Sequence, residues 1–134
     1  MLTSATSLKK IPEFTGIENP ERINFIKAEE VQPDLTFRKV VSKSEEKLET
    51  VIKLVSKIGK DTVLIFCNHR DAVDRISETL TKKGVANGSF HGGLEQVDRE
   101  RSLMKFRNKS SRVLITTDLA ARGLDIPEIG HVIH

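Results

Sequence analysis

The stretch VLITTDLAARGLDIP, residues 113–127, places a short apolar run directly before a dense group of polar residues. Residues 113–117 are predicted to form a strand buried on both faces of a parallel sheet, where near-continuous apolar runs occur. Two threonines, two aspartates and an Arg-Gly pair follow within residues 116–125. A chain that only had to leave a buried strand could use any turn, so this group raises the question of a function at the strand end.

Strand-like and helix-like segments alternate along the chain from residue 31 to its end. Further strands are expected at 37–41, 62–67 and 85–90 and from residue 131, and helices at 42–59, between Asn68 and Gly84, and at 96–107. Ser42 with Glu45 fits a capping box for the first helix, and Asn68 fits the cap of the second. Such alternation predicts an α/β fold, in which a parallel sheet carries helices on both faces.

The composition limits the classes to which the chain can belong. Its 134 residues suffice for one domain, and no export signal or membrane-spanning segment is expected. The single cysteine, Cys67, ends an apolar run and is expected to be a buried structural thiol. A net charge of +3 permits a polyanionic partner without requiring one. All six aromatic residues are Phe, which favours contacts with nucleic-acid backbone over base stacking.

Polar, glycine-containing segments follow three of the predicted strands. They are Asn68-His69-Arg70, His91-Gly92-Gly93, and the segment from Thr116 to Gly123. Because the carboxyl ends of parallel strands meet at one edge of a sheet, these segments are expected to converge there.

The residue types at this edge are compatible with phosphate and sugar. Glycines before a helix let a phosphate approach backbone N–H groups, Thr117, Arg99 and Arg122 can donate to phosphate oxygens, and Asp125 can accept from a sugar hydroxyl. Taken singly, each is more often a turn, a cap or a surface ion pair. The sequence contains no GxxxxGK[ST] loop, and no metal-ligand spacing or catalytic set is recognised.

The motifs taken together resemble those of the DEAD-box RNA helicases. TTDLAARGLDIP resembles their motif V, LIFCNHR (64–70) their motif IV, and HGGLEQVDRERSLMKFR (91–107) the segment with the Gln-x-x-Arg motif. Their order and spacing resemble the second RecA-like domain, a P-loop NTPase-type fold, over residues 31–134. Ser4-Ala5-Thr6 resembles motif III, which belongs to the end of the first RecA-like domain.

The resemblance implies a role for each strand-end residue. Thr117, Arg122 and Gly123 would contact RNA phosphates, and Asp125 would reach the ribose of ATP. Contacts or support on the RNA side would come from Asn68, His69, Arg70, His91, Gly92 and Arg99. Such contacts follow the sugar-phosphate path and are independent of base sequence.

The resemblance also implies that the chain is part of a larger enzyme. The parent would be a cytoplasmic ATP-dependent RNA helicase that closes two RecA-like domains around RNA, ATP and Mg²⁺. The Walker A, Asp-Glu-Ala-Asp and HRxGR motifs are absent from the 134 residues. The fragment itself is therefore expected to bind no cofactor and to hydrolyse no ATP.

Residues 1–30 are expected to be a remnant of the first domain together with a linker near 28–34. The alternating segment 22–27 looks like a strand without a partner, which would be disordered or would pair with another chain. Two alternatives to the helicase fragment stay open: a stand-alone module that binds RNA or protein, and a domain of another superfamily 2 helicase that acts on DNA.

Overall fold

The computed structural model of the chain describes residues 15–16, 21, 35–126 and 128–134. The chain forms two compact units, Met1–Lys39 and Val40–His134, and the sheet lies in the second unit. Ser4, Ala5 and Thr6, the strand expected at 22–27 and the linker expected near 28–34 lie outside the described residues.

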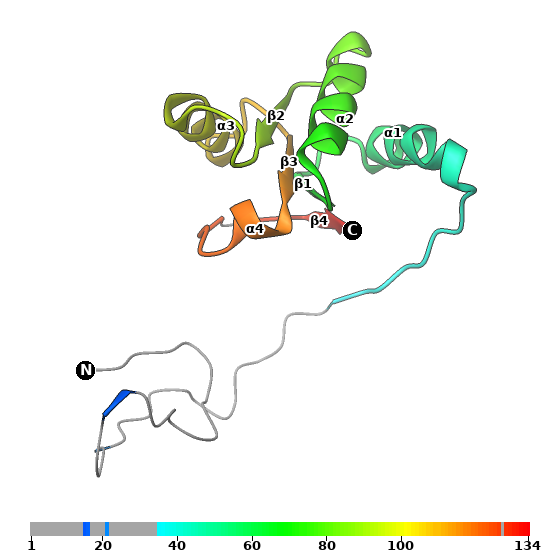
Figure 1. Cartoon of the computed structure of the whole chain (residues 1–134). Coiled ribbons are helices and arrows are strands. Elements are labelled where there is room, and N and C mark those ends of the chain that lie inside the picture. Colours follow the sequence, from blue (N-terminus) through cyan, green and yellow to red (C-terminus); the bar gives the residue numbers. More distant parts are fainter. Residues whose placement is uncertain (1–14, 17–20, 22–34, 127) are drawn as a thin grey trace. The chain divides into compact units, whose positions relative to one another are not determined.

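Four parallel strands form one sheet in the order β2-β3-β1-β4 (Figure 1). The strands are β1 (Val63–Cys67), β2 (Asn87–Phe90), β3 (Val113–Thr117) and β4 (His131–Ile133). The pairs β1·β3, β1·β4 and β2·β3 are all parallel, and β1 and β3 are matched from Val63↔Val113 to Cys67↔Thr117. The predicted parallel sheet is confirmed, with its two most buried strands side by side at the centre.

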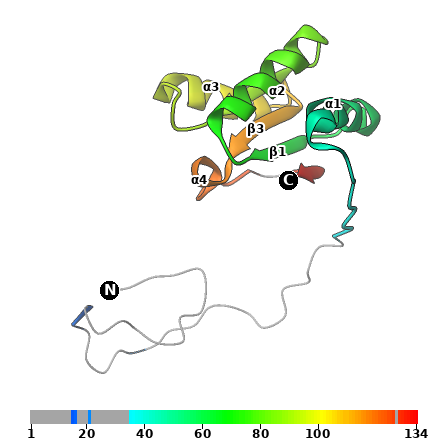
Figure 2. The same cartoon turned by 45° about the vertical axis from the view of Figure 1, so that its right-hand side comes forward.

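Helices cover both faces of this sheet, as predicted. They are α1 (Lys47–Ile58), α2 (Arg70–Lys82), α3 (Gln96–Arg107) and α4 (Asp118–Ala121), with the short 3₁₀ turn η2 (Ser44–Glu46) before α1. Figures 1 and 2 show α1 and α2 on one side of the strands and α4 on the other. The predicted bounds of α3, β3 and the start of β4 are confirmed to the residue.

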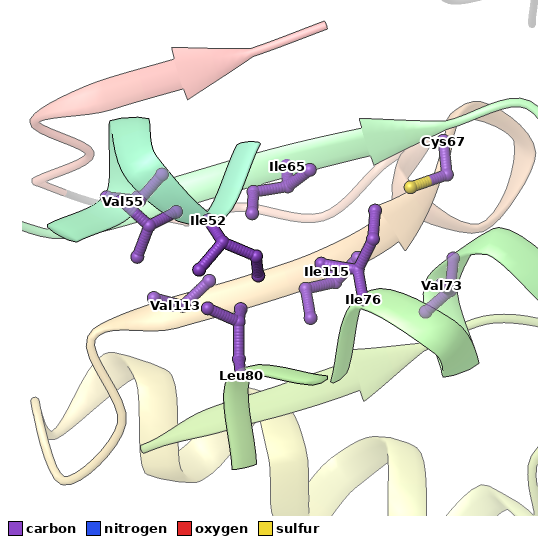
Figure 3. Packing of buried hydrophobic residues seen from close by; sticks show 10 residues of the cluster. Ile52, Val55, Ile65, Cys67, Val73, Ile76, Leu80, Val113 and Ile115 are labelled. Atoms are coloured by element: carbon purple, nitrogen blue, oxygen red, sulfur yellow. The ribbon is translucent and has the colours of Figure 1, made fainter. Parts of the chain in front are cut away.

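Two apolar clusters lie on opposite faces of the sheet, because successive strand side chains point in opposite directions. On one face, α1 and α2 pack on β1 and β3, and Figure 3 shows their side chains meeting over the strands. This cluster is made by Ile52, Val55, Val63, Ile65, Cys67, Val73, Ile76, Leu80, Val113 and Ile115. The second cluster, on the opposite face, is made by Leu64, Phe90, Phe106 and Leu114, and Leu124, Ile126 and Ile129 pack against it.

One expected strand and two expected caps are wrong. Residues 37–41 form no strand, because a strand needs a hydrogen-bonded neighbour and none of the four strands pairs with them. Ser42 and Glu45 form no capping box, since the Lys43 carbonyl accepts the Glu46 N–H (3.0 Å) and the chain enters α1 through η2.

Asn68 does not cap α2 either. The His69 carbonyl accepts the N–H groups of Ala72 (3.1 Å) and Val73 (3.3 Å), so the helix begins one residue later than expected. The Asn68 side chain is therefore left at the end of β1.

Cys67 is buried within the first apolar cluster. Burial raises the pKa of its thiol, because a thiolate loses its hydration there. The expectation of a buried structural thiol is confirmed.

We predict that Cys67 in the folded chain reacts with iodoacetamide at pH 8 at least about tenfold more slowly than after unfolding in urea, because the thiolate is the reactive form. Mass spectrometry of the time course measures the rate. Equal rates in the two states would show that the thiol is accessible and ionised as in a free cysteine.

Candidate functional site

An open hollow of about 610 Å³ lies at the carboxyl edge of the sheet. The loop after β1, the turn after β2, and α4 with Arg122 after β3 form its walls, so the predicted convergence of three strand ends is confirmed. The lining residues are Asn68, His69, Arg70, Asp71, His91, Gly92, Gly93, Thr117, Asp118, Leu119 and Arg122.

Several polar side chains in the hollow have no partner among the residues that the structure describes. Among the described residues, none forms a side-chain hydrogen bond or ion pair with Asn68, Thr117 or Arg122. Arg122 is exposed and Thr117 is half-buried, and neither needs to break an internal contact before it binds a ligand. A hydroxyl, an amide and a guanidinium that line one hollow can together hold an anion.

The formal charge of the hollow is balanced. Arg70 and Arg122 contribute +2, and Asp71 and Asp118 contribute −2, when the histidines are neutral. Asp71 lies 3.7 Å from the Arg70 Nε, and Asp118 lies 3.8 Å from the His134 Nε2. These exposed contacts are weak, so both arginines stay available to a phosphate.

His91 is the one predicted site residue in the hollow that is almost fully buried, at 4% exposure. Its Nδ1 accepts the Gly93 N–H (3.2 Å), and its Nε2 lies 3.0 Å from the Asp74 Oδ1. The Leu94 N–H donates to the His91 carbonyl (3.2 Å), which closes the turn. A Cβ on Gly93 would lie 3.2 Å from the His91 Nδ1, so only glycine fits this close approach without a shift.

Arg99, Gly123 and Asp125 do not line the hollow. Arg99 is half-buried on α3, and its buried Nε has no hydrogen-bond partner among the described residues. Gly123 has a φ of +77°, a conformation that favours glycine. The Asp125 carbonyl accepts from the Arg107 Nη2 (2.6 Å), and no described residue bonds to its exposed carboxylate.

A hydroxyl at the opposite edge of the sheet fastens the segment that follows α4. Thr62 Oγ1 donates to the Glu128 carbonyl (2.7 Å) and accepts from the Gly130 N–H (2.9 Å). The His131 N–H donates to the Thr62 carbonyl (2.9 Å). The segment that carries Asp125 is thus bonded to the residue that precedes β1.

Sequence reasoning missed three residues that shape this region: Asp74, Arg107 and Thr62. Asp74 follows Arg70 by one helical turn, and that spacing was the available signal for a side chain on the same side of α2. Arg107 and Thr62 act through partners 18 and 66 or more residues away, and no local pattern marks such contacts.

None of the described helices is long and apolar enough to cross a membrane. Within the same residues, no group of three or more His, Cys, Asp or Glu side chains lies close enough to hold a metal ion.

The sequence was compared with models of known protein families. The model described as "Helicase conserved C-terminal domain" matches residues 46–134. The chain belongs to this family. Its ATP-dependent relatives include eIF4A of Schizosaccharomyces pombe, named as an ATP-dependent RNA helicase, which is 37% identical over 138 residues. That alignment covers 100% of this chain and 35% of the relative, so this chain spans about a third of the length of eIF4A.

Solved structures of DEAD-box proteins share the fold of this helicase C-terminal domain. The structure of the C-terminal domain of the DEAD-box protein Dbp5 matches with a TM-score of 0.61 and 29% identity, over 66% of this chain and 49% of that one. Dbp5 of S. cerevisiae bound to RNA and ADP BeF3 matches with a TM-score of 0.59 and 30% identity, over 66% of this chain and 22% of that one. The predicted relationship to DEAD-box RNA helicases is confirmed.

We predict that Gly123→Ala lowers the free energy of unfolding by roughly 1–2 kcal/mol, the cost of a left-handed conformation for a residue with a side chain. Gly92→Ala is the matched control, because its φ is not in the left-handed region and a Cβ there meets nothing within 4 Å. Urea denaturation followed by circular dichroism measures both. An equal loss in the two variants would contradict the proposed backbone cause.

Proposed function

We propose that the chain forms the RNA-binding face of the second RecA-like domain of an ATP-dependent RNA helicase, and part of that enzyme's ATP-binding interface. The observation that carries the proposal is the hollow at the carboxyl edge, where three strand ends converge and the ends of β1 and β3 offer polar side chains without a described partner. Relatives named as ATP-dependent RNA helicases favour RNA over DNA as the partner of the parent protein.

RNA phosphates would bind in the hollow. Thr117 donates its hydroxyl and Arg122 its guanidinium, while Asn68 and Arg70 approach from the end of β1. The backbone at Gly92 is open, since nothing lies within 4 Å of a Cβ built there. The lining contains no aromatic ring except the two imidazoles, which agrees with recognition of backbone and not of bases.

His91, Arg99 and Gly123 fit supporting roles better than direct contacts. His91 is buried and uses both ring nitrogens within the protein. Arg99 has its Nε buried and does not line the hollow. Gly123 provides the left-handed turn that follows Arg122.

Asp125 fits the ATP side of the proposal. Its backbone is held by Arg107, and its carboxylate is exposed without a described partner, so it can accept hydrogen bonds from ribose hydroxyls. ATP hydrolysis supplies the free energy for strand separation in the proposed parent, and Mg²⁺ belongs to that nucleotide. Closure against a first RecA-like domain is part of the same proposal, as is a cytoplasmic location.

The extent of the similarity supports the proposed assignment of residues 1–30 to the end of the first domain and a linker. The alignment with eIF4A of S. pombe covers the whole of this chain, including the segment that precedes the helicase C-terminal match at residues 46–134. In the proposed parent, the two domains are therefore neighbours in one polypeptide.

We predict that single-stranded RNA binds this chain with an affinity that falls as salt rises, and more tightly than DNA of equal length. Arg122→Ala is expected to weaken RNA binding about fivefold and to lower the salt slope by about one, because one phosphate contact is lost. Fluorescence anisotropy over a salt series measures both quantities.

Arg101→Ala is the matched control for charge. Arg101 is exposed on α3 and paired with Asp98 (3.5 Å), and it does not line the hollow. Equal weakening by the two substitutions would mean that RNA responds only to net charge. Tighter binding of DNA would favour a helicase that acts on DNA.

We predict that the chain alone hydrolyses no ATP, with or without RNA, because its sequence contains neither a GxxxxGK[ST] loop nor the HRxGR motif. Phosphate release over several hours is the measurement. RNA-stimulated release that scales with the amount of chain and disappears in Asp125→Ala would contradict the prediction and exclude a contaminating ATPase.

A further inference from the structure

A buried histidine joins α2 to the turn after β2, which forms one wall of the hollow. The Gly93 N–H donates to the His91 Nδ1, so this nitrogen carries no proton. The neutral ring therefore has its proton on Nε2 and donates it to the Asp74 carboxylate at 3.0 Å. The two contacts are consistent with only one tautomer.

Asp74 differs from the other carboxylates around the hollow. Its side chain is 57% exposed, yet it bonds to a ring that is 5% exposed. Asp71 and Asp118 make only long contacts, with Arg70 at 3.7 Å and with His134 at 3.8 Å. Of these three aspartates, only Asp74 bonds to a buried side chain of the turn after β2.

The turn that His91 supports determines where two walls of the hollow meet. Gly93 lies between the His91 ring and the Arg70 guanidinium, since a Cβ built on it would be 3.2 Å from the His91 Nδ1 and 3.4 Å from the Arg70 Nη1. A switch of the tautomer would replace the acceptor of the Gly93 N–H by a donor, and a rotation of the ring would remove the acceptor. The backbone at Gly92 and Gly93 would then have to move.

We propose that Asp74 is a positioning residue for RNA binding. It holds His91 in the tautomer and orientation that accept the Gly93 N–H, and so fixes the turn after β2 that forms one wall of the hollow. The inference rests on the proposed RNA binding. Asp74 itself does not line the hollow, so it would act on the RNA only through the turn.

The sign of the effect separates this role from simple electrostatics. Removing a negative charge beside an RNA site strengthens binding when only Coulomb forces act. Loss of the Asp74 carboxylate is expected to weaken binding instead, because the disordered turn outweighs the gain in charge. Glu78→Ala removes the same charge from the same helix, at an exposed residue that neither lines the hollow nor touches His91 and is paired with Lys82 (2.7 Å).

The experiment compares the wild-type chain with Asp74→Ala, Asp74→Asn and Glu78→Ala. Without RNA, the imidazole ¹⁵N chemical shifts of His91 report its tautomer, and hydrogen exchange of the Gly93 amide reports the turn. Anisotropy with single-stranded RNA then reports affinity. A urea midpoint for each variant shows that the fold is retained, as expected for a half-exposed side chain.

In Asp74→Ala, we expect the proton to be shared between the two ring nitrogens, the Gly93 amide to exchange faster, and RNA affinity to fall about fivefold, the equivalent of one net hydrogen bond. Asp74→Asn keeps an acceptor oxygen and should fall between that variant and wild type. Glu78→Ala should leave the His91 spectrum unchanged and bind RNA as tightly as wild type or more tightly.

An unchanged His91 spectrum and Gly93 exchange in Asp74→Ala would overturn the positioning role. Tighter RNA binding by both alanine variants would overturn its connection with the ligand. Absence of RNA binding by the wild-type chain would overturn the proposed function instead, and the two measurements without RNA would still decide whether Asp74 positions the turn.

Discussion

The parallel pairing of β1 with β3 is the constraint on which the rest of the structure depends. Both strands are buried on both faces, and their register runs from Val63↔Val113 to Cys67↔Thr117. Because strand side chains alternate, a slip by one residue would turn the side chains that face α1 and α2 toward the opposite cluster. The same register makes the two strands end level with each other, so the loop after Cys67 and the helix after Thr117 open on one hollow.

The hollow is built for shape more than for charge. Its two arginines are matched by two aspartates, so long-range attraction of a polyanion is modest at this edge. What distinguishes it is that donors from the ends of β1 and β3 line it together, with open backbone at Gly92. Under the proposed function, a regularly spaced sugar-phosphate backbone would occupy this arrangement, in a chain that belongs to a helicase family.

The sequence was sufficient where one element carries its own pattern. The buried runs at β1 and β3, the helix over α3 and the three strand-end segments were predicted because burial periodicity and strand parallelism are properties of short stretches. Residues 37–41 were predicted wrongly, since a strand exists only with a neighbour. The cap predicted at Asn68 was wrong by one residue, because the first hydrogen bonds of α2 go to the His69 carbonyl. Asp74 escaped notice because its partner, His91, lies 17 residues away and the bond between them exists only after folding.

The segment between β3 and β4 leaves the carboxyl edge at Asp118 and reaches the amino edge at Gly130, so it crosses the whole face of the sheet. Leu124, Ile126 and Ile129 pack on that face along the way, and the Thr62 hydroxyl holds its far end. Such a span has a set length. Evolution can exchange side chains along it, but an added or deleted residue would have to be absorbed at one of its two fixed ends. Insertions and deletions in related sequences should therefore be rare in this segment and concentrate in exposed turns such as the one around Lys109.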